Sequence, residues 1–205
     1  MQKKIWNLFF REMCVEKSLV KRYYSPMEEK VDLSDLKCGY PDCCFMVANN
    51  WFRYRAGALI IEDGKLLVMK TKSSDCFYTV GGGVHMGESA ESCVLREVQE
   101  ETGAPYEIDH LAVVCENFFT GTEEIIKGYT CHVIEFYFLM KPRGMQELNA
   151  ESYGWNRDRE ERYWIPLEEL PKIDLRPEFL RTRMPVILNG KSLIHIVNDS
   201  RKLTY

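Results

Sequence analysis

Three consecutive glycines, Gly81 to Gly83, separate two stretches of very different character, and this junction constrains the fold more than any other feature of the sequence. Before it, residues 51–61 and 66–69 are rich in aromatic and aliphatic side chains and flank an Asp-Gly pair, which predicts a β-hairpin. After it, residues 89–102 repeat apolar side chains at helical spacing and end before a glycine, which predicts a helix. Because the strands lead through a tight turn into this helix, the helix is expected to pack on a face of the sheet.

The rest of the pattern indicates a mixed sheet covered by helices. Two long segments rich in β-forming residues, 107–119 and 129–140, follow the first helix. The later elements that we expect are a strand at 163–166, a helix at 177–188 and a strand at 193–197, after a loop at 141–159. We therefore predict an α/β domain over residues 45–205. Residues 1–44 are predicted to be an N-terminal extension with some helix, because its apolar residues Ile5, Phe9 and Met13 are roughly one turn apart.

Composition and charge exclude several classes of protein. The 205 residues are 45% hydrophobic and 28% charged, as in ordinary soluble domains, and no apolar run reaches the roughly 18–20 residues of a membrane helix. A net charge of −4 argues against a dedicated nucleic-acid binder, which usually has a basic face. Eight scattered cysteines, without a signal-peptide pattern, favour a cytoplasmic location.

One cysteine cluster stands out within this background. Cys38, Cys43 and Cys44 lack the second close pair that a zinc site needs, so a turn that enters a strand is the favoured interpretation. A small metal-binding or interaction module within residues 1–44 stays open as an alternative.

The predicted helix places three carboxylates on one face. Glu97, Glu100 and Glu101 have the spacing i, i+3 and i+4, and Arg96 is the one positive charge near them in the sequence. Unpaired like charges destabilise a helix, so a merely solvated acidic face is the weaker interpretation. Hard oxygen ligands behind a glycine-rich loop suit Mg²⁺ or Mn²⁺, with substrate phosphates completing the coordination.

These residues belong to a longer pattern, Gly-x5-Glu-x7-Arg-Glu-U-x-Glu-Glu-x-Gly-U, in which U is a bulky aliphatic residue. The matching residues are Gly82, Glu88, Arg96, Glu97, Val98, Glu100, Glu101 and Gly103, and the last position holds Ala104. Seven fixed residues at these spacings arise by chance roughly once in 10⁸ starting points at average residue usage. The segment resembles the Nudix box. The hairpin before it and the segment Trp164 to Leu170 are also similar to those of Nudix domains.

The resemblance implies a Nudix-type α/β/α sandwich with a mixed β-sheet. It also implies a Mg²⁺- or Mn²⁺-dependent pyrophosphohydrolase, in which an activated water attacks phosphorus in a nucleoside diphosphate linked to another group. The implied metal ligands are Glu97, Glu100, Glu101 and the carbonyl group of Gly81 or Gly82. Arg96 would orient the glutamates, and Glu88 would fix the junction between loop and helix. The substrate is left open between a nucleoside triphosphate and a nucleotide sugar. A catalytically silent Nudix domain that binds a nucleotide is the alternative function. A homodimer is a possible assembly for either function.

Candidate substrate contacts outside the acidic face are Arg53, Arg55, His85 and Gly83. Arginine binds phosphate through paired hydrogen bonds, although two arginines on one strand face suit an exposed surface pair equally well. His85 lies inside the box loop, where a solvent-exposed histidine is the plainer interpretation, and Gly83 lets the backbone approach a phosphate. An additional base or metal ligand is expected among Glu116, Glu123, Glu124 and Glu151. ADP-ribose-cleaving relatives often carry a proline after the box, and the corresponding positions near Asn117 hold none. This absence argues against ADP-ribose as the substrate.

Overall fold

The structure is a computed structural model, and it describes residues 42–72, 74–122, 126–149, 152–153 and 159–201. The predicted extension over residues 1–44 therefore lies outside the described residues, except for Asp42 to Cys44. No described helix is long and apolar enough to span a membrane.

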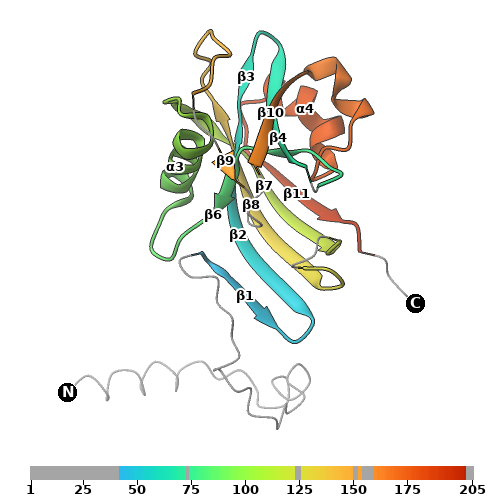
Figure 1. The fold of residues 1–205 in the computed structure, drawn as a ribbon. Helices are drawn as coiled ribbons and strands as arrows, with labels where there is room; N and C mark the ends of the chain where they lie inside the picture. Colours follow the sequence, from blue (N-terminus) through green and yellow to red (C-terminus); the bar gives the residue numbers. More distant parts are fainter. Residues whose placement is uncertain (1–41, 73, 123–125, 150–151, 154–158, 202–205) are drawn as a thin grey trace, which may run out of the picture. The chain divides into compact units, whose positions relative to one another are not determined.

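A six-stranded mixed sheet forms the larger layer of the fold (Figure 1). Its strands, in spatial order, are β1 (Cys44–Val47), β2 (Asn50–Leu59), β8 (Thr130–Met140), β7 (Ile108–Thr120) and β11 (Ile194–Asp199), and β6 (Gly81–Gly83) also pairs with β2. Strands β2 and β8 run parallel, as do β7 and β11, whereas β7 and β8 are antiparallel. The sheet is mixed, as the alternation of strands and helices in the sequence predicts.

A second, five-stranded sheet packs beside the first. It contains β3 (Ile61–Glu62), β4 (Lys65–Thr71), β10 (Arg159–Pro166) and β9 (Ser152–Tyr153) in that order, and β5 (Tyr78–Thr79) pairs with β4. The Asp63-Gly64 turn joins β3 to β4, and both residues have positive φ, which suits this residue pair in a tight hairpin.

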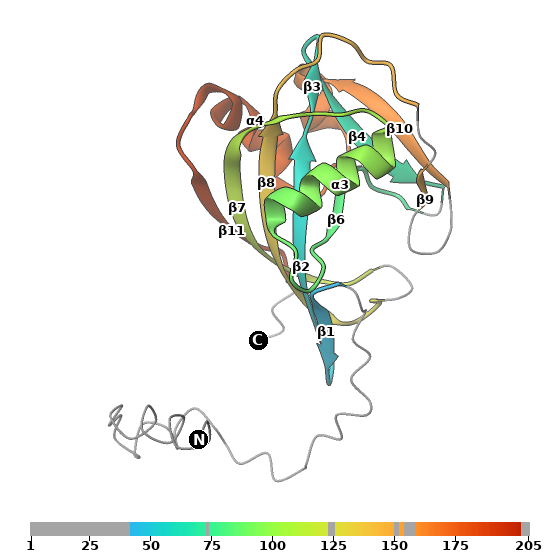
Figure 2. The same cartoon turned by 90° about the vertical axis from the view of Figure 1, so that its left-hand side faces the viewer.

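Helices α3 (Ala90–Thr102) and α4 (Phe179–Asn189) cover opposite faces of the larger sheet (Figures 1 and 2). A short 3-10 helix, Leu167–Lys172, precedes α4. Val94 and Val98 of α3 pack with Ala56 and Phe138 in one buried cluster. A separate cluster joins residues of α4, such as Leu180 and Met184, to buried side chains of β2, β7 and β8. The two cores make an α/β/α arrangement.

Local sequence signals set the ends of α3. The side chain of Ser89 accepts a hydrogen bond from the backbone N–H of Ser92, which satisfies one free donor of the first turn. Gly103 ends the helix in the left-handed conformation, where its N–H donates to the carbonyl oxygen of Gln99. The box therefore begins on β6 and ends at a defined helix C-terminus, which fixes its carboxylates relative to the sheet.

Within the predicted loop at 141–159, Ser152–Tyr153 forms strand β9, and β10 begins at Arg159 instead of Tyr163. Glu160 and Glu161 of β10 pair in register with Thr71 and Lys70 of β4. Glu160 is 9% exposed and accepts a 2.6 Å hydrogen bond from the hydroxyl group of Tyr78. Cross-strand pairing thus buries Glu160 although charged residues surround it in the sequence.

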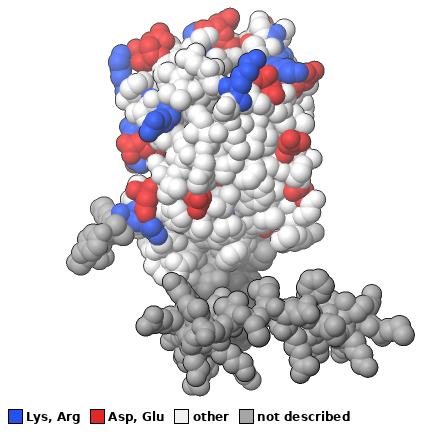
Figure 3. Space-filling view, turned by 180° about the vertical axis from the view of Figure 1, so that it is seen from behind, with Lys and Arg blue, Asp and Glu red and all other residues white. Residues whose placement is uncertain are grey.

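Acidic and basic side chains alternate on the rear face of the molecule. Figure 3 shows Lys and Arg beside Asp and Glu over this face, with uncharged surface between the groups. Among the described residues visible there, basic side chains do not gather in one patch. Such a face produces little long-range field of one sign, so attraction of a charged ligand depends on local groups.

Candidate active site

Arg96 on α3 connects three glutamates of the box, Glu88, Glu97 and Glu100, into one assembly. Its Nε and Nη2 atoms donate to the two carboxylate oxygens of Glu88 at 2.9 and 3.0 Å. Its Nη1 atom donates to Glu97 at 2.6 Å and to Glu100 at 3.2 Å, and Nη2 also reaches the carbonyl oxygen of Gly83 at 3.2 Å. Hydrogen bonds to Glu88 are the largest cause of the raised pKa of Arg96. Arg96 is therefore a fixed cation that joins the loop to the helix.

Glu88 holds the junction between the box loop and α3. Besides its paired contact with Arg96, it accepts a 3.0 Å hydrogen bond from the backbone N–H of His85. The hydrogen bond from Arg96, with the smaller contribution from His85, lowers the pKa of Glu88 to about 2 although burial opposes the shift. Glu88 is consequently ionised at neutral pH and closes the loop onto the helix.

Glu97 lies directly over the glycine turn. A Cβ atom at Gly82 would stand 2.3 Å from the Glu97 Oε1 atom, so any residue other than glycine would displace this carboxylate. The side chain is 13% exposed, and burial raises the pKa of Glu97 against the opposing effect of Arg96. Glycine at position 82 thus allows a carboxylate to approach the backbone of the turn.

Glu101 is half-buried beside Gly81. One of its oxygens accepts a 3.0 Å hydrogen bond from the backbone N–H of Gly81. Burial, followed by the charges of Glu160 and Glu97, raises the pKa of Glu101 well above its ordinary value. By contrast, Glu100 has a 59% exposed side chain and pairs with Arg96. The three box carboxylates therefore occupy different environments.

The donor chemistry of this region fits a divalent cation. Glu97 and Glu101 are half-buried, and this burial is the main reason that their charged forms are disfavoured. Nearby carboxylates add to the effect, Glu100 at Glu97 and Glu160 at Glu101, and a hard cation would relieve that cost. Over residues 42–201, where they are described, no three His, Cys, Asp or Glu side chains form a ready-made metal cluster. The box thus presents carboxylate oxygens suited to a divalent cation. Arg96 holds Glu97 and Glu100, and the backbone N–H of Gly81 holds Glu101.

Three of the four predicted substrate contacts lie together beside the turn. Arg53 Nη2 is 3.3 Å from an oxygen of Asp42, and His85 Nε2 is 3.5 Å from the other oxygen of the same carboxylate. A Cβ atom at Gly83 would stand 2.1 Å from Asp42 and 3.1 Å from Arg53. Asp42 therefore occupies the centre of this group, a role that the sequence does not indicate.

The fourth predicted contact, Arg55, has a half-buried side chain that hydrogen-bonds to the protein backbone. Its Nη2 atom donates to the backbone carbonyl oxygens of Thr79 at 2.7 Å and Gly81 at 3.1 Å, and its side chain is 12% exposed. Burial lowers the pKa of Arg55, but Tyr137 and then Glu135 outweigh this effect and raise it. These contacts fix the backbone between β5 and the glycine turn against Arg55.

Glu135 supports Arg55 from strand β8. It lies 3.8 Å from Arg55 Nη1 and accepts hydrogen bonds from Asn117 at 3.1 Å and from the Tyr137 hydroxyl group at 3.0 Å. Asn198 in turn donates to the side-chain oxygen of Asn117 at 2.8 Å. A buried polar network therefore links β11, β7 and β8 to the box turn. A lone glutamate within the apolar strand 130–140 was the available sequence signal for it.

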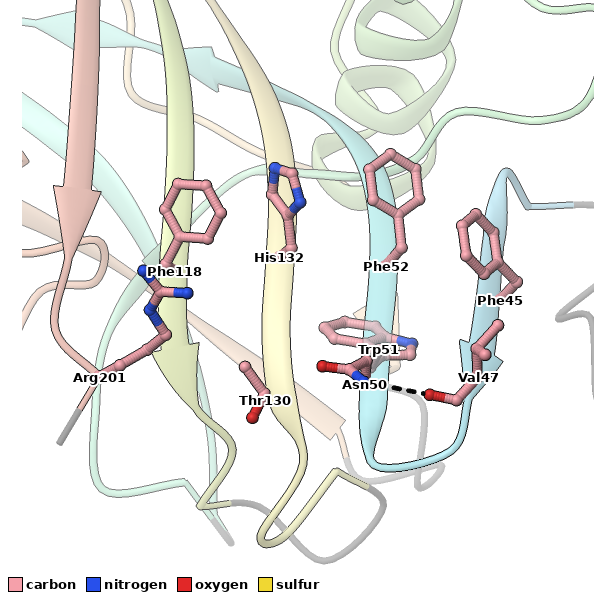
Figure 4. A pocket seen from close by; sticks show the side chains of 9 residues that line it. All are labelled: Phe45, Val47, Asn50, Trp51, Phe52, Phe118, Thr130, His132 and Arg201. Atoms are coloured by element: carbon pink, nitrogen blue, oxygen red, sulfur yellow. Dashed lines mark hydrogen bonds between the residues drawn. The ribbon is translucent and has the colours of Figure 1, made fainter. Parts of the chain in front are cut away.

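An aromatic row crosses the larger sheet. Phe45, Phe52, His132 and Phe118 are successive cross-strand neighbours on β1, β2, β8 and β7. Their ring centroids are 5.0, 5.5 and 4.3 Å apart along the row. The row lines an open cavity of about 300 Å³, and the guanidinium group of Arg201 lies 4.7 Å from the Phe118 ring (Figure 4). This cavity combines apolar rings with one cation.

The remaining candidates for an additional base lie elsewhere or outside the described residues. Glu116 pairs with His195 at 2.9 Å, and both side chains are partly exposed. Glu123, Glu124 and Glu151 are not among the described residues. Cys43 is half-buried and Cys44 is buried, whereas Cys38 lies outside the described part of the chain.

Comparison with known proteins identifies similar sequences. A family model described as the NUDIX domain matches residues 51–184. A MutT-like protein of Streptomyces ambofaciens is 32% identical over 98 residues, which cover 47% of this chain and 56% of that protein. An ADP-ribose pyrophosphatase of Methanocaldococcus jannaschii is 32% identical over 118 residues, which cover 56% of this chain and 62% of that protein. The chain thus spans less than two thirds of the length of either relative.

Solved structures show the same fold. The MutT protein from Methanosarcina mazei Go1 superposes with a TM-score of 0.51 at 23% identity, covering 67% of this chain and 94% of that one. A MutT protein from Bacillus halodurans gives a TM-score of 0.53 at 16% identity, covering 72% and 91%. These likenesses confirm the predicted sandwich with its mixed sheet.

Proposed function

The chain belongs to the Nudix family, and from this premise we propose that it is a Mg²⁺- or Mn²⁺-dependent pyrophosphohydrolase. Its substrate is a nucleoside diphosphate linked to another group. The observation that carries the proposal is the assembly around Arg96, which joins Glu88, Glu97 and Glu100 to the carbonyl group of Gly83. A helix face that served only solubility has no need of a guanidinium group shared among three carboxylates and a loop.

The residues of the chain divide the work of the reaction. Glu97, Glu100 and Glu101, with the carbonyl group of Gly81 or Gly82, would hold the cation. When bound, a divalent cation neutralises pyrophosphate oxygens and acidifies water. Arg96 orients Glu97 and Glu100 through the hydrogen bonds described above, while the glycine turn keeps the backbone close to the phosphates. In the reaction, water would add to one phosphorus of the anhydride, and the P–O bond to the bridging oxygen would break. The products would be a nucleotide and the remaining group as its phosphate, and the proton of the water would pass to solvent.

The aromatic row offers a surface for the base of the substrate. Its rings and the Arg201 guanidinium group surround a cavity of about 300 Å³, a size that accommodates part of a nucleotide. Stacking on aromatic side chains tolerates any base, because every base has a π-face. Both a nucleoside triphosphate and a nucleotide sugar satisfy these requirements, so the substrate is proposed at the level of these two classes.

A second candidate is a silent Nudix domain that binds a nucleotide without cleaving it. The retention of all three glutamates in a box held together by Arg96 favours the enzyme. A homodimer that completes the substrate pocket is compatible with either function, and light scattering of the purified chain measures its mass directly.

The enzyme proposal is tested by replacing Glu100 or Glu101 with glutamine. A panel of nucleoside triphosphates and nucleotide sugars is incubated with Mg²⁺, and the released phosphate, pyrophosphate or nucleotide is measured. We expect hydrolysis by the unaltered protein and a loss of about 100-fold or more in each variant, because each loses a charged oxygen ligand.

Glu91→Gln is the matched control, since Glu91 is an exposed glutamate in the first turn of the same helix. It should retain full activity. The proposal fails if the unaltered protein hydrolyses nothing in the panel. It also fails if Glu100→Gln and Glu101→Gln are as active as the control.

A further inference from the structure

Asp42 fills a position that is suited to an anion. Its two carboxylate oxygens contact Arg53 at 3.3 Å and His85 at 3.5 Å. The absence of a side chain at Gly83 makes this approach possible, because a Cβ atom there would stand 2.1 Å from the carboxylate. A guanidinium group, an imidazole and a side-chain-free backbone are the groups that hold a phosphate in many proteins. In this chain an internal carboxylate takes that place.

Backbone pairing fixes Asp42 beside the box loop. Asp42 and His85 form an antiparallel β-bridge. The N–H of Cys43 donates to the carbonyl oxygen of Val84 at 2.7 Å, and the N–H of Tyr54 donates to the carbonyl oxygen of Cys43 at 3.0 Å. The segment is therefore tied on both sides, to the box loop and to β2. Because the backbone around Asp42 is hydrogen-bonded to both neighbours, moving the carboxylate away from Arg53 and His85 would require these backbone hydrogen bonds to break.

The charge of Asp42 matters because Arg53 is nearly enclosed. The Arg53 side chain is 13% exposed, and that of Asp42 is 20% exposed. Burial and the neighbouring Arg55 lower the pKa of Arg53, whereas Asp42 and Glu97 raise it. Arg53 thus lies within electrostatic reach of both Asp42 and a proposed metal ligand. Interactions at this depth are screened less by water and salt than those at the open surface.

We propose that Asp42 is a specificity-determining residue, whose carboxylate neutralises Arg53 and disfavours substrates with a third phosphate. This inference rests on the proposed function, in which the box loop binds the two phosphates of the cleaved anhydride. A third phosphate that extends past Gly83 and His85 would approach the carboxylate of Asp42. Without that carboxylate, the phosphate would approach the guanidinium group of Arg53 instead. A nucleotide sugar, with two phosphates and an uncharged group, avoids that repulsion. Asp42 therefore favours nucleotide sugars over nucleoside triphosphates.

The test compares two substrates in the full-length chain and in Asp42→Asn. kcat/KM is measured with Mg²⁺ for ATP and for ADP-ribose, one member of each class. Loss of a like charge next to the substrate should raise the ratio of kcat/KM for ATP to that for ADP-ribose by about tenfold. Asp42→Ala should shift the ratio in the same direction, because both variants remove the charge and only one keeps an amide. Thermal midpoints of both variants verify that they fold.

Asp109→Asn is the matched control, because Asp109 also pairs with a histidine, His110, at 2.7 Å but lies at the start of β7 outside the box. It should leave the ratio unchanged. An Asp42→Asn ratio within twofold of the unaltered protein overturns the inference. An equal fall in kcat/KM for both substrates also overturns it, since that result indicates only a structural role.

Failure of the proposed function gives a different result. If the unaltered protein hydrolyses neither substrate, equilibrium binding of inorganic pyrophosphate and tripolyphosphate in the presence of Mg²⁺ still tests Asp42 by calorimetry. We expect Asp42→Asn to improve tripolyphosphate affinity relative to pyrophosphate affinity by about tenfold. An unchanged ratio of affinities rejects the role of Asp42 independently of catalysis.

Discussion

Replacing Gly82 with alanine places a methyl group against the Glu97 carboxylate. The new Cβ atom would stand 2.3 Å from Oε1, 2.5 Å from Cδ and 2.8 Å from Oε2 of Glu97. An ordinary contact needs about 3.4 Å, so the carboxylate must move by about 1 Å. Because the obstructing atoms are the end of a side chain and not backbone, this movement should cost less than about 1 kcal/mol of folding free energy.

The same displacement should be costly for catalysis. A shift of about 1 Å in a group that positions reacting atoms reduces rates by about 100-fold. We therefore expect Gly82→Ala to lower kcat/KM by about two orders of magnitude while its denaturation midpoint changes little. Steady-state kinetics on the preferred substrate and chemical denaturation, carried out on the same preparation, measure the two effects.

Gly190→Ala is the control, because Gly190 has a φ of −99° at the end of α4 and is remote from the box in sequence. It should leave kcat/KM unchanged. If Gly82→Ala is folded and keeps kcat/KM within threefold of the unaltered protein, the reasoning that places Glu97 in the reaction is refuted.

Two further predictions concern stability. The folded-state pKa of Glu88 is about 2, below its ordinary value of 4.5, so its ionised form stabilises the fold above pH 4.5 and this contribution disappears as the pH falls towards 2. Glu88→Gln should therefore be less stable than the unaltered protein at pH 7, with a difference that shrinks below pH 4.5 in denaturant titrations; a difference independent of pH contradicts this. Leu180→Ala should lower the free energy of unfolding by about 3 kcal/mol, because Leu180 is a fully buried residue of α4, whereas Leu193→Ala, at a 55% exposed position, should cost less than about 0.5 kcal/mol. Equal losses in urea denaturation would show that the core under α4 is not packed as described.

The box could be predicted from the sequence because its determinants are local. Ser89 and Gly103 mark the ends of the helix, and the spacing of Arg96 from the glutamates sets which side chains can meet on the helix surface. The mixed sheet was also predictable, since long strands on either side of a helix allow few other arrangements.

The residues that complete the site could not be predicted because their positions depend on strand register. Glu135, Asp42 and Glu160 come from three different strands or strand ends, and each reaches the box through pairing with a distant segment. A shift of register by one residue would turn each side chain to the opposite face, and no local pattern fixes that register. Arg55 illustrates the same limit: its residue type suggests phosphate binding, which stays a prediction, and no local pattern indicates its hydrogen bonds to the carbonyl oxygens of Thr79 and Gly81.

The parallel pairing of β2 with β8 has a consequence for how the protein folds. Asn50 is in register with Thr130, so this contact closes a loop of 80 residues, the difference between 130 and 50, and the whole box lies within that loop. Closing so long a loop is entropically costly and makes folding slower than in proteins with local contacts. A nascent chain that ends before residue 130 lacks β8, the parallel neighbour of β2, on which β6 pairs in turn. We therefore expect that the ribosome synthesises all residues of the box before the box can fold. The geometry of the site forms only after β8 has been synthesised and has paired with β2.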